Sequence, residues 1–93
     1  GSFGELVVVA EVIARPVSAD VHCDAAALVD AFAVGEFYVR SARMQQGEVP
    51  VVVGAGAIGL SAVAALRSRG VGPIIVSDYN AGRRELALRF GAD

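Results

Sequence analysis

Two short runs of β-branched residues, at positions 51–53 and 74–76, alternate in the second half of the chain with longer amphipathic segments. An uninterrupted apolar run is typical of a parallel strand that is covered on both faces. Hydrophobic residues three or four positions apart, as after each run, are typical of helices. The order from residue 50 onward is therefore strand, helix, strand, helix, which requires a right-handed crossover between parallel strands. This pattern predicts the α/β class and the first part of a doubly wound domain.

Turn and capping residues mark the ends of these elements. Pro50 stands at the start of the first strand, where a missing amide donor costs little. Gly70 is suited to the left-handed C-terminal cap of the first helix. Asn80 suits the N-cap of the second helix, and Gly91 ends it.

The first half of the chain is less regular. Residues 5–10 and 11–17 are rich in β-branched residues and predict one or two strands, and the Arg15-Pro16 step ends the second of them. Neither segment carries residues that suggest chemistry.

Residues 24–43 have helical spacing. Asp24 is predicted to cap the start of this helix, and Glu36 and Arg40 are spaced to form an ion pair one turn apart. Gly35, near its middle, predicts either a kink or a point of close packing.

The most informative feature is a glycine pattern, GxGxxG, that directly follows the first predicted strand and opens the helix after it. Gly54 suits a tight turn, Gly56 lets the backbone approach a pyrophosphate, and Gly59 lets the helix pack closely on the strand. The N–H groups from Gly54 to Gly59 are then free to bind a pyrophosphate, and Gly54, Gly56, Ala57, Ile58 and Gly59 are the residues expected to hold it. The alternative is that the glycines only allow close packing at a sharp turn.

Asp78 ends the second predicted strand, at the place where a carboxylate can accept hydrogen bonds from an adenosine ribose. A 2′-phosphate at that place would be repelled, because two like charges some 4 Å apart cost on the order of 4 kcal/mol at an effective dielectric constant near 20. Asp78 therefore favours NAD over NADP. Arg83 and Arg84 oppose this preference, since a nearby arginine is how NADP is received. The alternative for Asp78 is an ordinary turn residue.

Composition limits the kinds of partner. A net charge of -2 and a pI near 5.2 give no basic patch, so neither nucleic acid nor an anionic membrane is expected. A content of 55% hydrophobic and 19% charged residues indicates the interior of a larger protein. A single cysteine and the lack of a signal-peptide pattern indicate the cytoplasm. The start at Gly1-Ser2 indicates a cloning remnant or a family glycine rather than a native beginning.

Residues 49–66 carry no charge and are just long enough to be considered as a membrane span. If this segment were a helix, each of its glycines would lower the stability of the helix by about 1 kcal/mol and its proline by about 3 kcal/mol. The strand, turn and helix interpretation explains the same residues without that cost, and we therefore expect no membrane span.

Several runs of residues resemble the zinc-type alcohol dehydrogenases of the medium-chain dehydrogenase/reductase family. The most specific run is VVVGAGAIGL at residues 51–60, and the others are GELVVV at 4–9, AALVD at 26–30, IVSD at 75–78, RELA at 84–87 and FGAD at 90–93. The resemblance implies a fragment with three parts: the end of a GroES-like catalytic domain at 1–23, a linking helix at 24–47, and the first part of an NAD-binding Rossmann domain at 48–93.

The same resemblance implies a function for the parent enzyme. It would transfer hydride between NAD and a small alcohol or carbonyl substrate, with zinc polarising the substrate oxygen, and it would form homo-oligomers. Asp30 matches a position at or beside the catalytic zinc, and Arg83 matches a basic residue that contacts the adenosine ribose; a solvated carboxylate and a solvated helix face are the alternatives. The family's other zinc ligands and its proton-relay residues lie upstream of residue 1. No catalytic residue is therefore assigned, and the fragment is expected to be inactive alone.

His22, Cys23 and Asp24 look like metal ligands, but adjacent side chains seldom converge on one ion. We therefore expect no metal there and interpret Cys23 as a small packed hydrophobe. Two other functions stay open for the whole chain: a truncated, non-catalytic nucleotide-binding or interaction module, and an FAD-binding domain, which shares the glycine pattern.

Overall fold

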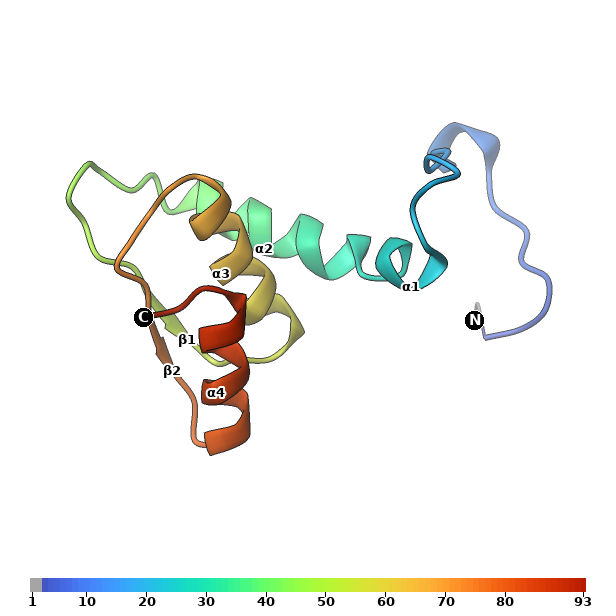
Figure 1. The fold of residues 1–93 in the computed structure, drawn as a ribbon. Coiled ribbons are helices and arrows are strands. Elements are labelled where there is room, and N and C mark those ends of the chain that lie inside the picture. The colour runs from blue at the N-terminus through green and yellow to red at the C-terminus, as the bar shows by residue number, and fades with distance from the viewer. Residues whose placement is uncertain (1–2) are drawn as a thin grey trace.

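The computed structural model describes residues 3–93, so the expectation for Gly1 and Ser2 lies outside it. Two parallel strands and four helices form the α/β arrangement that the sequence predicts, that of a partial Rossmann-like unit (Figure 1). In chain order the elements are the 3-10 helix η1 (Glu11–Ile13), α1 (Cys23–Ala26), α2 (Val29–Ser41), β1 (Val51–Val53), α3 (Ala57–Ser68), β2 (Ile75–Ser77) and α4 (Ala81–Phe90).

β1 and β2 pair in register from Val51 with Ile75 to Val53 with Ser77. α3 and α4 both cover the same face of this small sheet, since Val76 of β2 packs against buried residues of both helices. Val52 points toward them and packs in the core, whereas Val51, Val53 and Ile75 are 59%, 85% and 49% exposed. Within the residues described, the other face of the strands is left uncovered, since both helices lie on one side.

The core lies between α3, α4 and the sheet. Ile74 and Val63 are fully buried there, and Leu66 packs with them. A second group forms around Leu60 and Ala87, nearer the carboxyl ends of the strands.

α2 crosses α3 at Gly35, which is buried. A Cβ atom at Gly35 would lie 2.7 Å from the backbone nitrogen of Ala62 and 2.7 Å from the Cβ of Ser61. The close-packing interpretation of this glycine is confirmed, and α2 continues through it. Glu36 pairs with Arg40 at 3.3 Å, as its spacing predicts, and also with Arg69 at the end of α3.

The predicted start of the first helix is wrong. α1 begins at Cys23, its N-cap is His22, and His22 Nδ1 accepts the backbone N–H of Asp24 at 3.3 Å. Asp24 lies inside the helix and cannot cap it, since a capping residue needs an extended backbone. The helix also stops at Ala26 and resumes at Val29, so the predicted single helix is two.

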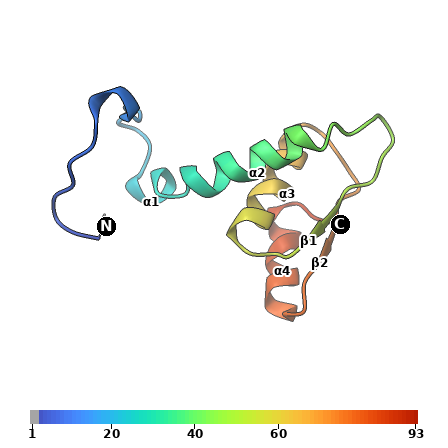
Figure 2. The ribbon, with the colours of Figure 1, turned by 180° about the vertical axis from the view of Figure 1, so that it is seen from behind.

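The predicted strands at 5–10 and 11–17 are also wrong. The backbone is extended without pairing, apart from η1, and side chains such as Leu6 and Val8 are 94% and 100% exposed. A strand needs a neighbour for its hydrogen bonds, and none of residues 3–93 pairs with this segment. Both ribbon views place it away from the sheet, beyond the far end of α2 (Figures 1 and 2).

The other predicted ends are confirmed. Gly70 and Gly91 follow α3 and α4 with φ angles of +73° and +107°, and Asn80 Oδ1 caps α4 by accepting the N–H of Arg83 at 3.1 Å. Among the described residues, no helix combines the length and apolar character that a membrane crossing requires. The uncharged stretch 49–66 is divided between β1, the glycine turn and α3.

Arg67 and Asp93 fasten the amino end of β2 to the ends of α3 and α4. Arg67 donates from Nε to the carbonyl of Gly91 and from Nη2 to Asp93 Oδ2, each at 2.8 Å. The same Asp93 oxygen accepts the N–H of Ile74 at 2.8 Å, and the Asp93 N–H donates to the Ile74 carbonyl at 2.9 Å. Three elements therefore meet in one set of hydrogen bonds.

Candidate nucleotide site

The glycine turn joins the carboxyl end of β1 to α3. Gly54 has a φ of +97°, a conformation that side chains disfavour. Its N–H donates to the Ser77 carbonyl at 2.7 Å, so the expectation that this N–H is free for a pyrophosphate is wrong. A Cβ at Gly59 would lie 1.9 Å from the Gly54 carbonyl oxygen, so the helix packs directly on the turn. No atom lies within 4 Å of the place where Gly56 would carry a Cβ. The turn is therefore closely packed against α3 at Gly59 and open at Gly56.

Unpaired donors face this open side. α3 starts at Ala57, its N-cap Gly56 offers no side chain, and the first helical bond is from the Leu60 N–H to the Gly56 carbonyl at 2.9 Å. The N–H groups of Ala57, Ile58 and Gly59 thus have no partner within the helix. Together with the positive end of the helix dipole, they suit an anion such as a pyrophosphate.

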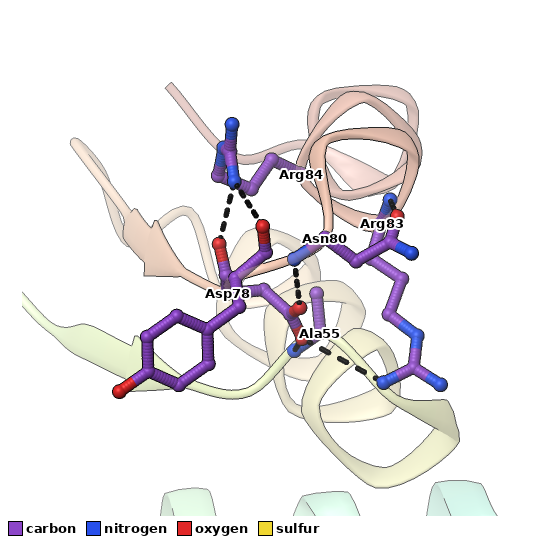
Figure 3. A network of polar contacts seen from close by, with 6 residues as sticks. Ala55, Asp78, Asn80, Arg83 and Arg84 are labelled. Atoms are coloured by element: carbon purple, nitrogen blue, oxygen red, sulfur yellow. Dashed lines mark hydrogen bonds and ion pairs between the residues drawn. The ribbon is translucent and has the colours of Figure 1, made fainter.

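Asp78 follows β2 and turns its carboxylate toward the glycine turn (Figure 3). Oδ2 accepts the N–H of Ala55 at 2.9 Å, and Oδ1 accepts the N–H of Asn80 at 2.8 Å. The side chain is 11% exposed. Each oxygen keeps a second lone pair, so the carboxylate can still receive the hydroxyls of a sugar.

The two backbone bonds also set the charge of this group. Donation from Asn80, and then from Ala55, holds the pKa of the Asp78 carboxyl below its ordinary value, and the charges of Arg83 and Arg84 add to this effect. Asp78 is therefore ionised at neutral pH. An ionised acid beside the turn is the arrangement that repels a 2′-phosphate.

The adjacent arginines of α4 have different surroundings. Arg84 Nη1 donates to the carbonyls of Asp78 and Tyr79 at 2.7 and 3.1 Å. Arg83 Nη1 lies 3.9 Å from Asp78 Oδ2, and its side chain is 60% exposed. The sequence suggested both as arginines that could receive a phosphate, and the resemblance assigned a ribose contact to Arg83 alone; the structure gives their side chains different partners.

A hollow of about 570 Å³ lies over the carboxyl ends of the strands, between Gly54, Asp78 and Arg83. Tyr79 also lines it and is fully exposed, and sequence reasoning overlooked this residue. An aromatic side chain directly after a strand-end acid is the signal that could have identified it. A second, apolar hollow of about 660 Å³ runs along β1 from the end of α2 to Ile58.

Asp30, the candidate metal residue, lies apart from this site in the first turn of α2, where it is exposed. Within residues 3–93, the one group of three or more potential metal ligands is 22–24, and Asp30 is not part of it. The structure therefore does not bring Asp30 together with other ligands, and its role stays a prediction.

The donor atoms of His22, Cys23 and Asp24 lie within 4.8 Å of one another, closer than their adjacency in sequence led us to expect. His22 Nδ1 is 3.4 Å from Asp24 Oδ2 and 3.9 Å from Cys23 Sγ. Cys23 is exposed, so the interpretation of it as a packed hydrophobe is wrong. Cys23 belongs to the short helix α1, which has no buried residue.

Comparison with known proteins found relatives along the whole chain, although no family model matches it. The chain is 34% identical over 93 residues to (R,R)-butanediol dehydrogenase of Saccharomyces cerevisiae, covering all of the chain and 24% of that protein. It is 38% identical over 92 residues to probable diacetyl reductase [(R)-acetoin forming] 2 of the same yeast, covering 99% of the chain and 22% of the relative. It is 33% identical over 93 residues to L-threonine 3-dehydrogenase of Rhizobium johnstonii, covering the whole chain and 27% of the relative.

The chain thus spans about a quarter of the length of these curated relatives. Their names describe oxidoreductases that act on alcohols or on the corresponding carbonyl compounds. The similarity includes the segment with the glycine turn and Asp78, since it covers all 93 residues. Over the 93 residues given, the chain is homologous to zinc-type alcohol dehydrogenases of the medium-chain dehydrogenase/reductase family, which confirms the resemblance found in the sequence.

Proposed function

We propose that this chain forms the pyrophosphate and adenosine-ribose part of an NAD site in a zinc-type dehydrogenase of small alcohols. One observation carries the proposal: the Asp78 carboxylate and the open glycine turn lie at the same edge of the sheet, joined by the Ala55 N–H at 2.9 Å. A turn whose N–H groups can bind an anion, in contact with a carboxylate that can accept hydrogen bonds from hydroxyls, suits a nucleotide diphosphate.

The roles follow from the contacts. Pyrophosphate oxygens would accept from the N–H groups of Ala57, Ile58 and Gly59, with Gly56 leaving room for their approach. The ribose hydroxyls would donate to the free lone pairs of Asp78. Bound NAD would supply the hydride acceptor of the reaction, and zinc in the parent enzyme would polarise the substrate oxygen.

NAD is the preferred cofactor in this proposal because Asp78 is ionised and nearly buried. Arg83 is the cation closest to its carboxylate and offsets part of the repulsion toward NADP. This leaves NADP as the weaker ligand rather than an excluded one.

The reaction itself is proposed for a longer parent protein. Asp30 would lie at the edge of its catalytic zinc, and the division at residues 23/24 and 47/48 would separate catalytic domain, linking helix and cofactor domain. We further propose an alcohol or carbonyl substrate, homo-oligomers and a cytoplasmic location for the parent, and no turnover by the 93 residues alone.

The test is calorimetric titration of NAD and NADP into the parent enzyme and its Asp78→Ala variant. We expect the variant to weaken the binding of NAD more than that of NADP. The dissociation constant of NADP divided by that of NAD should therefore fall toward one. Asp24→Ala, an exposed acid outside the site, is the matched control and should keep the ratio. An unchanged ratio in Asp78→Ala would refute the role of Asp78.

A second candidate is a non-catalytic module that binds a partner chain. The exposed side chains of Val51, Val53 and Ile75 on the open face of the sheet favour it. Analytical ultracentrifugation of the 93-residue chain distinguishes the two. Self-association that Val53→Asp abolishes, with no binding of NAD, would favour the module.

A further inference from the structure

We propose that Arg84 is a positioning residue of the nucleotide site: it holds the turn after β2 so that the Asp78 carboxylate faces the glycine turn, and it leaves the neighbouring Arg83 free to meet the ligand. The ligand in this inference rests on the proposed function. The positioning does not, and it can be measured without any ligand.

The contacts of Arg84 carry the first step. β2 ends at Ser77, so the carbonyls of Asp78 and Tyr79 lie beyond the last pair of the strand ladder. Arg84 reaches back from the first turn of α4 and donates to both, at 2.7 and 3.1 Å (Figure 3). Hydrogen bonds from a charged donor are stronger than neutral ones, and the single nitrogen Nη1 holds both successive carbonyls of the turn.

The second step leads from the turn to the acid. With its carbonyl held, Asp78 is oriented so that one carboxylate oxygen accepts from Asn80 and the other from Ala55. The Ala55 bond spans two strands and reaches the glycine turn itself. Arg84 therefore acts on the ligand site through Asp78, without pointing at it.

The third step separates the two arginines. Arg83 uses its backbone N–H to complete the cap of α4 on Asn80, while its side chain remains 60% exposed at the hollow beside Asp78. The guanidinium of Arg84 is directed to carbonyls instead. Of these two arginines, only Arg83 lines the hollow in which a phosphate would lie.

The first measurement needs no ligand. In ¹H-¹⁵N spectra of the 93-residue chain, Arg84→Gln should shift the Ala55 amide toward the position that it takes in Asp78→Asn. Arg84→Lys should shift it less, because an ammonium group can hold one of the two carbonyls. Arg89→Gln, in the last turn of α4, is the matched control and should leave the Ala55 amide in place.

The second measurement uses ADP-ribose as the probe, by calorimetry, in a double-mutant cycle. Arg84→Gln should weaken ADP-ribose roughly tenfold, the size of one lost charge-assisted hydrogen bond. In an Asp78→Asn background the same change should weaken it less than about twofold, because its effect passes through Asp78. Thermal melting of each variant reports any general loss of stability, which would not produce this coupling.

Two results would overturn the inference. One is an Ala55 amide that does not move in Arg84→Gln, and the other is an equal loss of ADP-ribose affinity in both backgrounds. If the unaltered chain does not bind ADP-ribose, the proposed function fails, while the Ala55 amide still decides whether Arg84 positions Asp78.

Discussion

Residues 51–93 and residues 3–21 have similar local patterns but different structures. VVV at 51–53 and LVVV at 6–9 are almost the same sequence, yet the first is a paired strand and the second is exposed and unpaired. The first run has β2 beside it and α3 above it. The comparison teaches that a β-rich run specifies a strand only where the rest of the chain supplies a neighbour.

The largest expected effect is from a cavity in the paired region. Ile74→Ala removes a fully buried side chain and should lower the free energy of unfolding by about 2–5 kcal/mol. Val8→Ala, fully exposed in the unpaired segment, should change it by less than about 0.5 kcal/mol. Urea denaturation followed by circular dichroism measures both, and similar losses would show that the two regions do not differ in this way.

A smaller but more local effect is expected at the glycines. Gly59→Ala places a methyl group 1.9 Å from the Gly54 carbonyl oxygen and should lower the free energy of unfolding by about 1–3 kcal/mol. The variant should also lose the binding of ADP-ribose. Gly4→Ala, whose Cβ would meet only the Leu6 carbonyl at 3.7 Å, should change neither. Thermal melting and calorimetry report the two quantities, and normal binding by Gly59→Ala would contradict the role of the turn.

The caps of the two regions differ as well. Asn80→Ala removes the bond to the Arg83 N–H and should cost about 1 kcal/mol. His22→Ala removes the cap of α1, a four-residue helix with no buried side chain, and should cost less. The denaturant concentrations at the midpoints of unfolding measure the difference, provided that the slopes of the transitions are equal. A larger loss of stability in His22→Ala than in Asn80→Ala would contradict this prediction.

The smallest effect concerns two acids. The pKa of Asp78 is lowered by the N–H groups of Asn80 and Ala55, and that of Asp20 by the hydroxyl of Ser18. A group with a lowered folded pKa stabilises the fold above its unfolded value, here near 3.8, and loses this contribution as pH falls through the folded value.

Unfolding of the unaltered chain and of Asp78→Asn should therefore differ at pH 7, and the difference should disappear only as the pH falls below 3.8 and through the lowered folded pKa of Asp78. Asp20→Asn should make no difference at either pH, because its bond to Ser18 lies within one exposed turn. A pH-independent difference for Asp78→Asn would mean that its charge has no part in the fold.

Local patterns predicted most of the second half of the chain. β1, α3, β2 and α4 lie where periodicity and caps place them, and Gly70, Asn80 and Gly91 end or begin helices as expected. These features depend on neighbours a few residues away. They are therefore visible in the sequence.

Features that depend on distant neighbours were not predictable. The bond between Asp78 and Ala55 joins residues 23 positions apart, and the sequence placed both at one site without indicating that they touch. The separation of Arg83 from Arg84 depends on how α4 starts. The cap at His22 replaced that of Asp24 because the helix begins two residues earlier than its acid suggests.

The bonds of Arg67 and Asp93 have a consequence for motion. They hold the amino-terminal edge of the sheet, where the chain enters β2, to the carboxyl ends of both α3 and α4, while the bonds at the opposite edge join only the glycine turn, the turn after β2 and the start of α4. Any adjustment on binding a nucleotide is therefore expected to occur as a small rotation of the strand tips about a fixed base. Amide exchange should accordingly be slow at Ile74 and faster at Ala55.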